Sequence, residues 1–380
     1  GIGARQTRLR QLVGELGLEL EAATLPLDAA APFAAALAAL PWPARHQLQR
    51  LWARLERQAA ALPPEPAPEH ALAQRLARQP LADWLQDAWL GRRARRLAGE
   101  MAAQLFGAAP DELSALDALL QLRRHGGRQA LAERRFGAAQ ARPQGGMQAL
   151  CAGLAVRLGD SLLLETPLFG LRQDAQAVEL FTPRGRLRAA RVVLALPALQ
   201  LAGLACLPAQ PGWRDHGLRH LLPQASLEAY LSYERAFWRE RLPTVALPRA
   251  AGDCLILEQP PLGAGGALRV RLGGAAALRA SGLDAAARRE LLLEILAGVL
   301  GEAARAPQEL LLQHWADEPY LRCAEPRWAR GPWLLQGAAL RRPLGRVHFA
   351  GADLAPRWPG TLEGAVEAGE LAAEEVLRLG

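Results

Sequence analysis

The 380-residue sequence contains no lysine and no asparagine, so arginine supplies every basic side chain other than histidine. The formal net charge is +7, and this residue usage is typical of a GC-rich bacterial genome. The arginines are spread among glutamate and aspartate along helical segments and do not cluster with aromatic residues. This distribution argues against a nucleic-acid surface.

Long apolar runs and paired cysteines are also absent. No run approaches the roughly 18 uninterrupted apolar residues of a membrane-spanning helix, and no signal peptide is visible. The four cysteines, Cys151, Cys206, Cys254 and Cys323, are widely separated and form no C-x-x-C motif. We therefore expect a cytoplasmic protein with reduced thiols and no metal site.

The most informative segment lies near the C-terminus. Residues 347–350 form a short apolar run that predicts a buried strand, and Gly351 follows at once, where the backbone can turn. Gly360 or Thr361 is a suitable N-cap for the next segment. That segment has helical periodicity, with small or apolar residues at Leu362, Ala365, Val366, Gly369 and Ala373.

A strand, a glycine turn and a helix N-terminus together form a site for negative charge. The start of a helix carries roughly +0.5 of a charge and unpaired N–H donors. The pyrimidine edge of a reduced flavin would suit such a site. An ordinary strand–loop–helix corner of an α/β protein fits the spacing equally well.

The sequence of this segment resembles the last segment of the flavin-containing amine oxidase superfamily. That superfamily includes the monoamine oxidases and, more distantly, the phytoene and squalene desaturases. The family pattern F-A-G is matched by Phe349-Ala-Gly351. The pattern W-x-G-x-x-E-G-A-x-x-A-G is matched by Trp358-Pro-Gly360-Thr-Leu-Glu363-Gly-Ala-Val-Glu-Ala-Gly369. The resemblance implies that this helix lies under the isoalloxazine of FAD, with cofactor contacts from Gly351, Ala352, Asp353, Trp358, Gly360, Thr361, Leu362 and Ala365.

The N-terminus matches a second part of the family pattern. Residues 9–16 place leucine and valine on one helical face, and Gly17 is a predicted C-cap. The resemblance places the preceding glycine turn beside the flavin and makes Gly3 and Gln6 cofactor-binding residues. In the family, a strand, a G-x-G-x-x-G loop and an acidic ribose-binding residue precede this point. All three are missing here, and no G-x-G-x-x-G precedes a helix in the chain. The resemblance thus predicts an N-terminally truncated flavin domain, through a fragmentary gene prediction or through natural loss of flavin binding.

The middle of the chain alternates between helical and strand patterns. Residues 22–135 are helical in period and punctuated by prolines, and a helix is predicted to start at Leu81. Strands are predicted over 161–165, 177–181 and 191–196, then over 226–233, 254–257, 267–272 and 309–315. Helices are predicted over 148–158 and 284–300. Within these segments the resemblance places Leu168 and Ala195 on the adenine–ribose side of FAD and makes Trp315 and Tyr320 cofactor-binding residues.

These patterns predict an α/β protein, α+β overall. The resemblance implies that an N-terminally truncated FAD-binding Rossmann-like domain is interleaved with a substrate domain of helices on a mixed sheet. It assigns residues 1–24, 136–211 and 319–380 to flavin binding, and residues 25–135 and 212–318 to the substrate domain.

The sequence departs from the monoamine oxidases at three places. Glu228 stands where they carry a lysine near the flavin, and Thr361 and Glu325 replace the two tyrosines of the amine cage. The cysteine used for covalent flavin attachment is replaced by Ala324, and Cys323 is expected to point elsewhere. FAD is therefore predicted to be non-covalent. Glu228, Glu325 and Thr361 are the substrate-pocket candidates, and the two glutamates are either attractants for a cationic amine or simply solvated.

The resemblance implies hydride transfer from a C–N or C–C bond of a small-molecule substrate to flavin N5, with O₂ as a candidate electron acceptor. No side-chain triad is required, and His314 and His348 are predicted to be structural strand residues. Two alternatives remain open. One is a desaturase with a long apolar tunnel, and the other is a fragment that cannot hold FAD.

Overall fold

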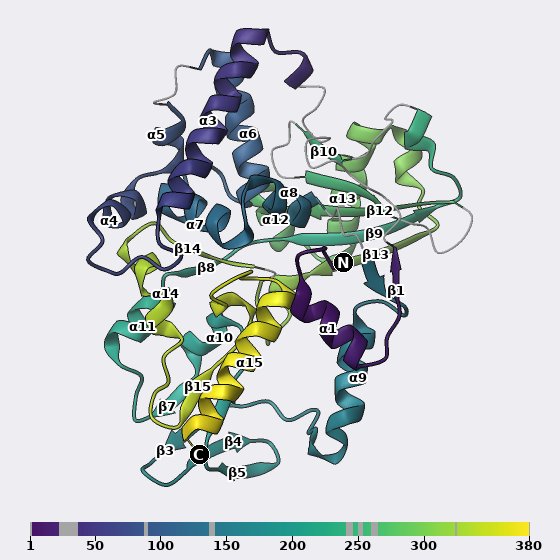
Figure 1. Cartoon of the computed structure of the whole chain (residues 1–380). Helices are drawn as coiled ribbons and strands as arrows, with labels where there is room; N and C mark the ends of the chain where they lie inside the picture. The colour runs from purple at the N-terminus through teal and green to yellow at the C-terminus, as the bar shows by residue number, and fades with distance from the viewer. Residues whose placement is uncertain are drawn as a thin grey trace.

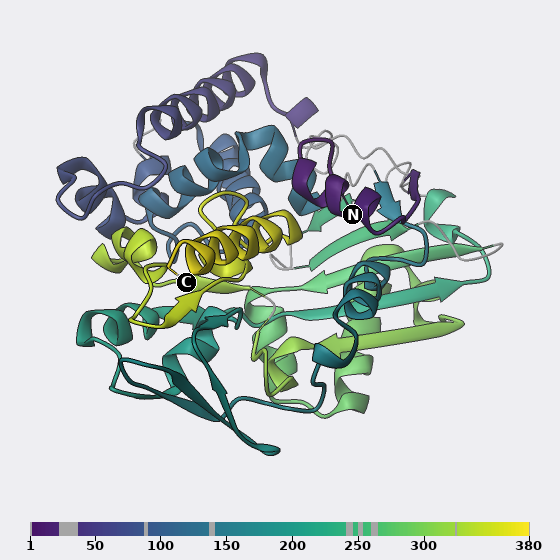
Figure 2. The ribbon, with the colours of Figure 1, turned by 60° about the horizontal axis from the view of Figure 1, so that its bottom comes forward.

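The computed structural model describes residues 2–22, 37–86, 90–136, 141–240, 246–249, 254–259, 265–323 and 325–379. Figures 1 and 2 show a layer of helices, a large sheet beside it, and a third part in which the C-terminal helix lies next to the N-terminal one. Neighbouring elements in space often come from distant parts of the sequence. The predicted mixture of helices and sheet is therefore observed.

The helical layer comprises α3 (Trp42–Ala61), α4 (Ala71–Arg78), α5 (Leu81–Gln86), α6 (Arg92–Phe106), α7 (Ala115–His125) and α8 (Arg128–Phe136). Its leucine and alanine faces form the largest apolar core of the described residues. The Ser114 hydroxyl caps α7 by accepting the Asp117 N–H at 3.0 Å. The helical period predicted for this region is confirmed over its described part. Residues 87–89, at the end of the helix predicted from Leu81, lie outside it.

The large sheet has the strand order β10-β11-β12-β9-β13, and every neighbouring pair is antiparallel. Its strands are β9 (Leu227–Tyr233), β10 (Ala246–Arg249), β11 (Cys254–Gln259), β12 (Gly266–Leu272) and β13 (Glu309–His314). Alternate residues of β9 and β12 are buried against α12 (Gly274–Ser281) and α13 (Ala285–Leu300). The intervening residues face the helical layer. The four strands predicted here are confirmed, with ends shifted by one or two residues.

In the third part, strand β15 (Val347–Phe349) of the C-terminal segment pairs in parallel with β6 (Val192–Leu194). A four-stranded sheet adjoins it, formed by β3 (Gly170–Gln173), β4 (Val178–Thr182), β5 (Gly185–Ala189) and β7 (Ala205–Leu207). Short pairs join β1 (Leu20–Ala22) to β2 (Ala141–Pro143) and β8 (Leu221–Pro223) to β14 (Pro326–Trp328). The small helices α10 (Ala198–Gly203), α11 (Gly212–Leu218) and α14 (Gly337–Leu340) complete it.

The strand predicted over residues 161–165 is wrong. Residues 159–161 form a single 3-10 turn, and the chain from 162 to 169 is irregular. Glu165 has a φ of 54°, a left-handed conformation incompatible with a strand, and Pro167 lacks an N–H for a ladder. The preceding helix α9 (Gln148–Leu158) agrees with the prediction. However, Leu150 is its one fully buried residue, and Val156 is 82% exposed.

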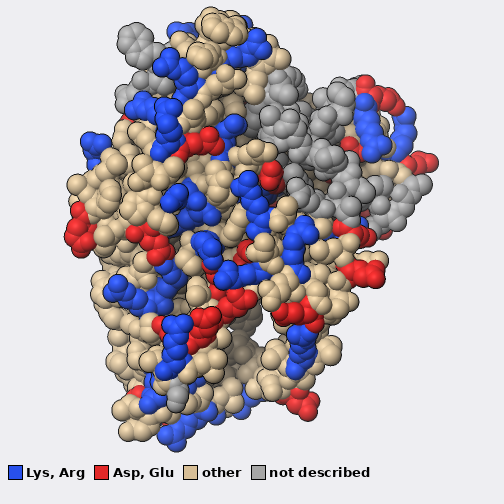
Figure 3. All heavy atoms as spheres, in the orientation of Figure 1, with Lys and Arg blue, Asp and Glu red and all other residues tan. Residues whose placement is uncertain are grey.

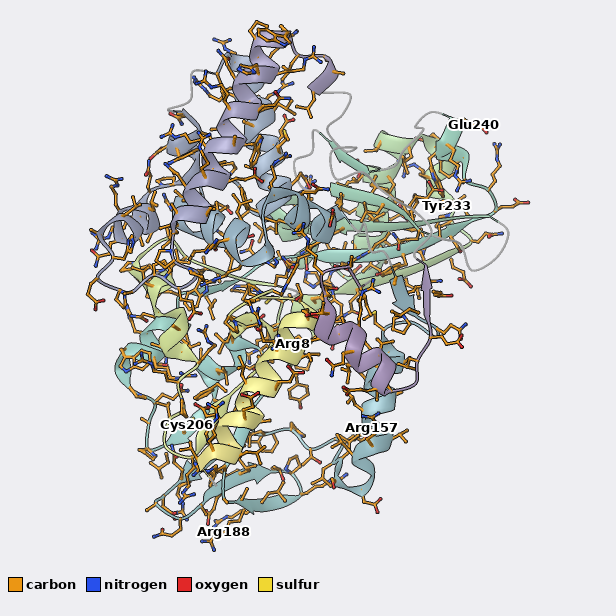
Figure 4. All side chains as sticks on the ribbon, viewed as in Figure 1. Arg8, Arg157, Arg188, Cys206, Tyr233 and Glu240 are labelled. Atoms are coloured by element: carbon orange, nitrogen blue, oxygen red, sulfur yellow. The ribbon has the colours of Figure 1, made fainter. Side chains whose placement is uncertain are left out.

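The two ends of the described chain meet through α1 (Thr7–Glu15) and α15 (Leu362–Leu379), which lie side by side (Figure 4). Glu363, only 4% exposed, accepts the N–H groups of Arg8 at 3.1 Å and Leu9 at 2.8 Å. Its carboxylate therefore caps α1, whose own preceding residue makes no side-chain cap. The Arg8 guanidinium in turn donates to Glu370 at 2.6 Å.

Replacing Glu363 by alanine is expected to lower the free energy of unfolding by about 2–4 kcal/mol, because two helix N–H groups lose a charged, buried acceptor. Glu363→Gln keeps one acceptor oxygen and should cost about half as much. Glu374→Gln on the exposed side of α15 is the matched control, with an expected change within about 0.5 kcal/mol. Urea unfolding measures all three. Equal stability of Glu363→Ala and the control would contradict the capping role.

Candidate active site

A cavity of about 990 Å³ lies where the helical layer, the large sheet and the start of α15 meet. Leu255 and Leu257 of β11 belong to its wall, as do Ala130 of α8 and Met147 before α9. Most of the predicted site residues also line this cavity. They are Gly3, Gln6, Glu228, Trp315, Glu325, Trp358, Gly360, Thr361 and Leu362.

A second predicted group lies at the carboxyl ends of β15 and β6. Gly351, Ala352 and Asp353 line a smaller cavity of about 210 Å³. Gly351 has a φ of 110°, and a Cβ there would lie 3.4 Å from the Leu196 carbonyl oxygen, with the Ala195 backbone next to it. The structure therefore brings Ala195 and Gly351 together.

Cys323 and Leu321 line both cavities, so the two share a wall. The expectation that the Cys323 side chain points away from the flavin stays a prediction. Burial raises the pKa of its thiol to about 11, assisted by the nearby carboxylate of Asp353. At neutral pH this cysteine is therefore a thiol and a poor nucleophile.

Besides Ala195, three predicted residues line neither cavity. Leu168 packs against the core around β3 and β6. Tyr320 is 64% exposed. Ala365 is half-buried in the first turn of α15, where its N–H bonds to the Thr361 carbonyl at 3.0 Å.

The N-terminal loop reaches the cavity through a tight turn. The Gly3 N–H donates to the Gln6 side-chain oxygen at 2.9 Å, and the Gln6 N–H donates to the Gly3 carbonyl at 3.2 Å. Arg10 holds the same carbonyl from α1 at 3.1 Å. These bonds fix the loop ahead of α1, so the docking of α1 on Glu363 also positions this part of the cavity wall.

The loop before α15 is held in a strained conformation. Trp358 has a φ of 52°, which is rare for a residue with a side chain, and Gly360 has a φ of 67°. A Cβ on Gly364 would lie 2.4 Å from the Trp358 carbonyl oxygen, so only glycine fits beneath this loop. The Thr361 hydroxyl accepts the Gly364 N–H at 3.1 Å, which confirms the predicted N-cap. Together these features hold the Trp358 indole in the cavity wall, 5.8 Å from the His125 ring.

A network of charges covers the sheet side of the cavity. In the register of β9 and β12, Glu228 stands opposite Arg271. Arg269 bonds to Glu228 at 3.0 Å, and Arg134 of α8 bonds to Glu325 at 3.0 Å. Both glutamates are therefore paired with arginine, and with 12% of the Glu228 and 34% of the Glu325 side chain exposed, neither is simply a solvated carboxylate. Attraction of a cationic amine by the two stays a prediction.

Sequence reasoning missed the three arginines. Arg269 and Arg271 alternate with the buried Leu268, Val270 and Leu272, so the period of two already places both arginines on one face of β12. That signal was available from the sequence. Arg134 gives no such signal. It lies on α8, 191 residues before its partner Glu325 in the sequence, and reaches the site only through the packing of that helix.

The histidines predicted to be structural are paired, as expected. His348 Nδ1 lies 2.7 Å from Glu375, and His314 Nε2 lies 3.1 Å from the Ser281 hydroxyl. Among the described residues, no group of three or more His, Cys, Asp or Glu side chains is arranged to hold a metal ion. Within the same residues, every helix is too short or too polar to cross a bilayer.

Comparison with known proteins decides the family. The family model of the flavin containing amine oxidoreductases matches residues 4–377. The chain belongs to this family. The matched residues of this amine oxidoreductase family member include helix α1 near the N-terminus and most of helix α15.

Individual relatives agree with this assignment. AofH of Mycobacterium tuberculosis, named as a flavin-containing monoamine oxidase, is 28% identical over 336 residues, covering 87% of this chain and 73% of AofH. An L-amino acid dehydrogenase of Synechocystis is 29% identical over 239 residues, covering 62% of this chain and half of that protein. The structure of cyclohexylamine oxidase from Brevibacterium oxydans superposes with a TM-score of 0.85 at 25% identity, covering 100% of this chain and 86% of that one.

These findings confirm three predictions. The chain is an FAD-dependent oxidoreductase of the amine oxidase superfamily, its cofactor is FAD, and its fold is that of the family. The desaturase alternative is not favoured, because the relatives are amine and amino acid oxidoreductases.

The raised pKa of the partly buried Asp353 carboxyl predicts that the stability of the folded protein depends on pH. Burial raises the pKa of this carboxyl above its ordinary value of 3.8, against the lowering effect of the Ala198 N–H that it accepts at 3.0 Å. A group with a raised folded pKa favours the fold below its unfolded pKa, and this contribution is lost as pH rises through the folded pKa. Asp353→Asn keeps an acceptor oxygen without the charge. It should therefore melt above the unmodified protein at pH 7, with the difference shrinking towards pH 4.

Asp174→Asn is the control of opposite sign. The N–H groups of Gln176 and Ala177 lower the pKa of Asp174, so this replacement should destabilise at pH 7 and matter less as pH falls. Melting temperatures between pH 4 and 8 measure both variants. A shift of Asp353→Asn that is the same at every pH would rule out the burial effect.

Proposed function

We propose that this protein oxidises a small-molecule amine with a non-covalently held FAD, and that the isoalloxazine binds in the 990 Å³ cavity beside the start of α15. The observation that carries the proposal is the convergence in that cavity of the Gly3–Gln6 turn, the Trp358–Leu362 loop and one face of the sheet. These segments are distant in sequence, and each was assigned to the flavin or substrate from the family pattern alone.

The residues present fit a flavin ring. Thr361 and Leu362, at the start of α15, line the cavity, so the positive end of the helix dipole lies at its wall. Gly364 has no Cβ, and this lets the Trp358 carbonyl pack against the first turn of α15 and keeps the Trp358 loop in place. Trp315 and Trp358 supply aromatic surfaces to the lining. The named relatives that oxidise amines support an amine as the substrate.

When bound, the flavin would supply the chemistry by accepting a hydride from the carbon that carries the amine nitrogen, so that the C–H bond breaks and the C–N bond becomes a C=N bond. The protein's task is then to bind and orient the substrate and to exclude water. Leu255, Leu257 and Leu321 contribute to the apolar part of the described lining. No histidine belongs to that lining, so orientation rather than side-chain acid–base chemistry is the expected contribution of the described residues.

The remaining assignments are part of the same proposal. Ala324, which stands at the position of covalent attachment, lies outside the described residues, but the raised pKa of the neighbouring Cys323 thiol disfavours attachment there. Gly351, Ala352 and Asp353 lie at the carboxyl ends of parallel strands, where open α/β sheets bind ligands, and are candidates for contacts with the rest of FAD. We also assign FAD binding to residues 1–24, 136–211 and 319–380, and substrate binding to residues 25–135 and 212–318.

Titration with FAD, followed by quenching of flavin fluorescence, tests cofactor binding. Trp358→Ala is expected to weaken FAD binding by roughly tenfold, because a base or ring stacked on an aromatic side chain gains about 1–3 kcal/mol. Trp42→Ala, which removes a 69% exposed indole on α3, is the control and should leave FAD binding unchanged. Equal affinity of both variants for FAD would remove the assigned role of Trp358.

The mode of attachment and the reaction are tested on the same preparation. Acid precipitation should release all bound flavin into the supernatant, since no covalent bond is expected. Addition of an amine without oxygen should bleach the visible absorption band of the oxidised flavin. Flavin that stays with the precipitate contradicts the non-covalent assignment, and a protein that takes up no FAD contradicts the proposed function.

A further inference from the structure

The described lining of the large cavity carries an excess of positive charge. It contains four arginines, Arg5, Arg134, Arg269 and Arg271, and three glutamates, Glu133, Glu228 and Glu325. The formal charge of these side chains is therefore +1. A cavity that accepted simple cationic amines would be expected to carry the opposite sign, since like charges in a partly buried site repel.

Three of the arginines are already engaged. Arg5 donates to the Gly126 carbonyl at 3.3 Å. Arg269 donates to Glu228 at 3.0 Å, and its guanidinium lies 5.8 Å from the centre of the Tyr230 ring. Arg134 donates to Glu325 at 3.0 Å and to the Gly360 carbonyl at 3.1 Å. Glu228 and Glu325 thus each have an arginine at hydrogen-bond distance.

Arg271 is placed differently. Its guanidinium lies between the same two carboxylates, but at 4.0 Å from Glu228 and 3.5 Å from Glu325. Charge-assisted N–H···O bonds are typically about 2.7–2.9 Å long, so both contacts are long. The side chain is largely buried, with 21% of its surface exposed, and it faces the cavity. Arg271 is therefore the surplus cation of the cluster.

From this arrangement we infer that the substrate carries a carboxylate as well as its amine, as an amino acid does, and that Arg271 binds that carboxylate. A guanidinium presents a planar fork that matches a carboxylate with two parallel hydrogen bonds. One carboxylate would bring the formal charge of the cluster to zero, whereas a cationic amine without one would add to the excess. The inference rests on the proposed function and names the substrate class of the same cavity.

The surroundings of Arg271 suit such a substrate. On β11 the residue opposite Arg271 is Leu255, and Leu257 stands opposite Arg269, so apolar side chains lie next to the charged cluster on the same sheet face. Trp315 adds an indole to the lining. A substrate held by its carboxylate at Arg271 thus has apolar surface available for its side chain.

Calorimetric titration tests the inference with compounds that differ by one group. Leucine and phenylalanine are compared with the amines that lack the carboxylate, 3-methylbutylamine and 2-phenylethylamine. They are also compared with the acids that lack the amine, 4-methylpentanoate and 3-phenylpropionate, which cannot be oxidised at a C–N bond. 4-Methylpentanoate and 3-phenylpropionate should bind with a Kd at least tenfold lower than 3-methylbutylamine and 2-phenylethylamine. Binding is measured on the 380-residue protein with FAD added and without it.

Arg271→Met is the decisive variant. It should weaken binding of the two acids at least tenfold and change binding of the two amines less than threefold, while Arg271→Lys restores part of the acid affinity. Glu228 and Glu325 keep Arg269 and Arg134 in the variant, so the fold should persist, and the melting temperature checks this. Arg219→Gln, which removes an exposed arginine from the end of α11, is the control and should behave as the unmodified protein.

The outcomes separate the inference from the proposed function. Tighter binding of amines than of acids by the unmodified protein overturns the inference, even if Arg271→Met fails to fold. Unchanged acid binding by a folded Arg271→Met also overturns it. The flavin spectrum of the same samples reports independently on the proposed function, because a protein without bound FAD contradicts that function whatever the acids do.

Discussion

The buried carboxylate of Glu363 is the interaction on which the site depends. It accepts two N–H groups at the start of α1 from the first turn of α15, and so joins residues more than 350 positions apart. The Gly3–Gln6 turn lies just before one partner, and Thr361 lies just before the other. Both flanking segments line the same cavity. One capping interaction therefore sets the distance between two walls of the proposed flavin site.

The alternation of residues along the strands of the large sheet forms a core on one face and lines the cavity on the other. Even-numbered residues of β12 are buried against α13 and form a core, while the odd-numbered Arg269 and Arg271 face the cavity. The same alternation on β9 buries Leu227 and Ala229 and presents Glu228. The apolar face fixes the register of the strands, and that register places each charge opposite its partner. On the face shown in Figure 3, arginines and acidic side chains are likewise interspersed where α1 meets α15.

The sequence predicts the parts of this molecule that depend on local physics. The N-cap at Thr361, helix α9 and the alternating strands of the sheet follow from residue type and spacing, and the structure has them. The C-cap predicted at Gly17 is Leu16 in the structure, and Gly17 is the left-handed residue that follows it. The irregular chain around Glu165 was missed, because Leu162, Leu163 and Leu164 look like a strand until backbone geometry is known. The pairing of Glu325 with Arg134 could not be predicted, because it depends on how two distant segments pack.

Arg134 also links parts of the protein that could otherwise move separately. From α8 in the helical layer, its single guanidinium holds the Glu325 carboxylate and the Gly360 carbonyl. Gly360 sits in the loop that carries Trp358. If the helices were to move away from the sheet, both bonds would have to break together, and the loop that carries Trp358 would lose a restraint. The position of the helical layer and the rigidity of the aromatic wall are thus coupled through one side chain.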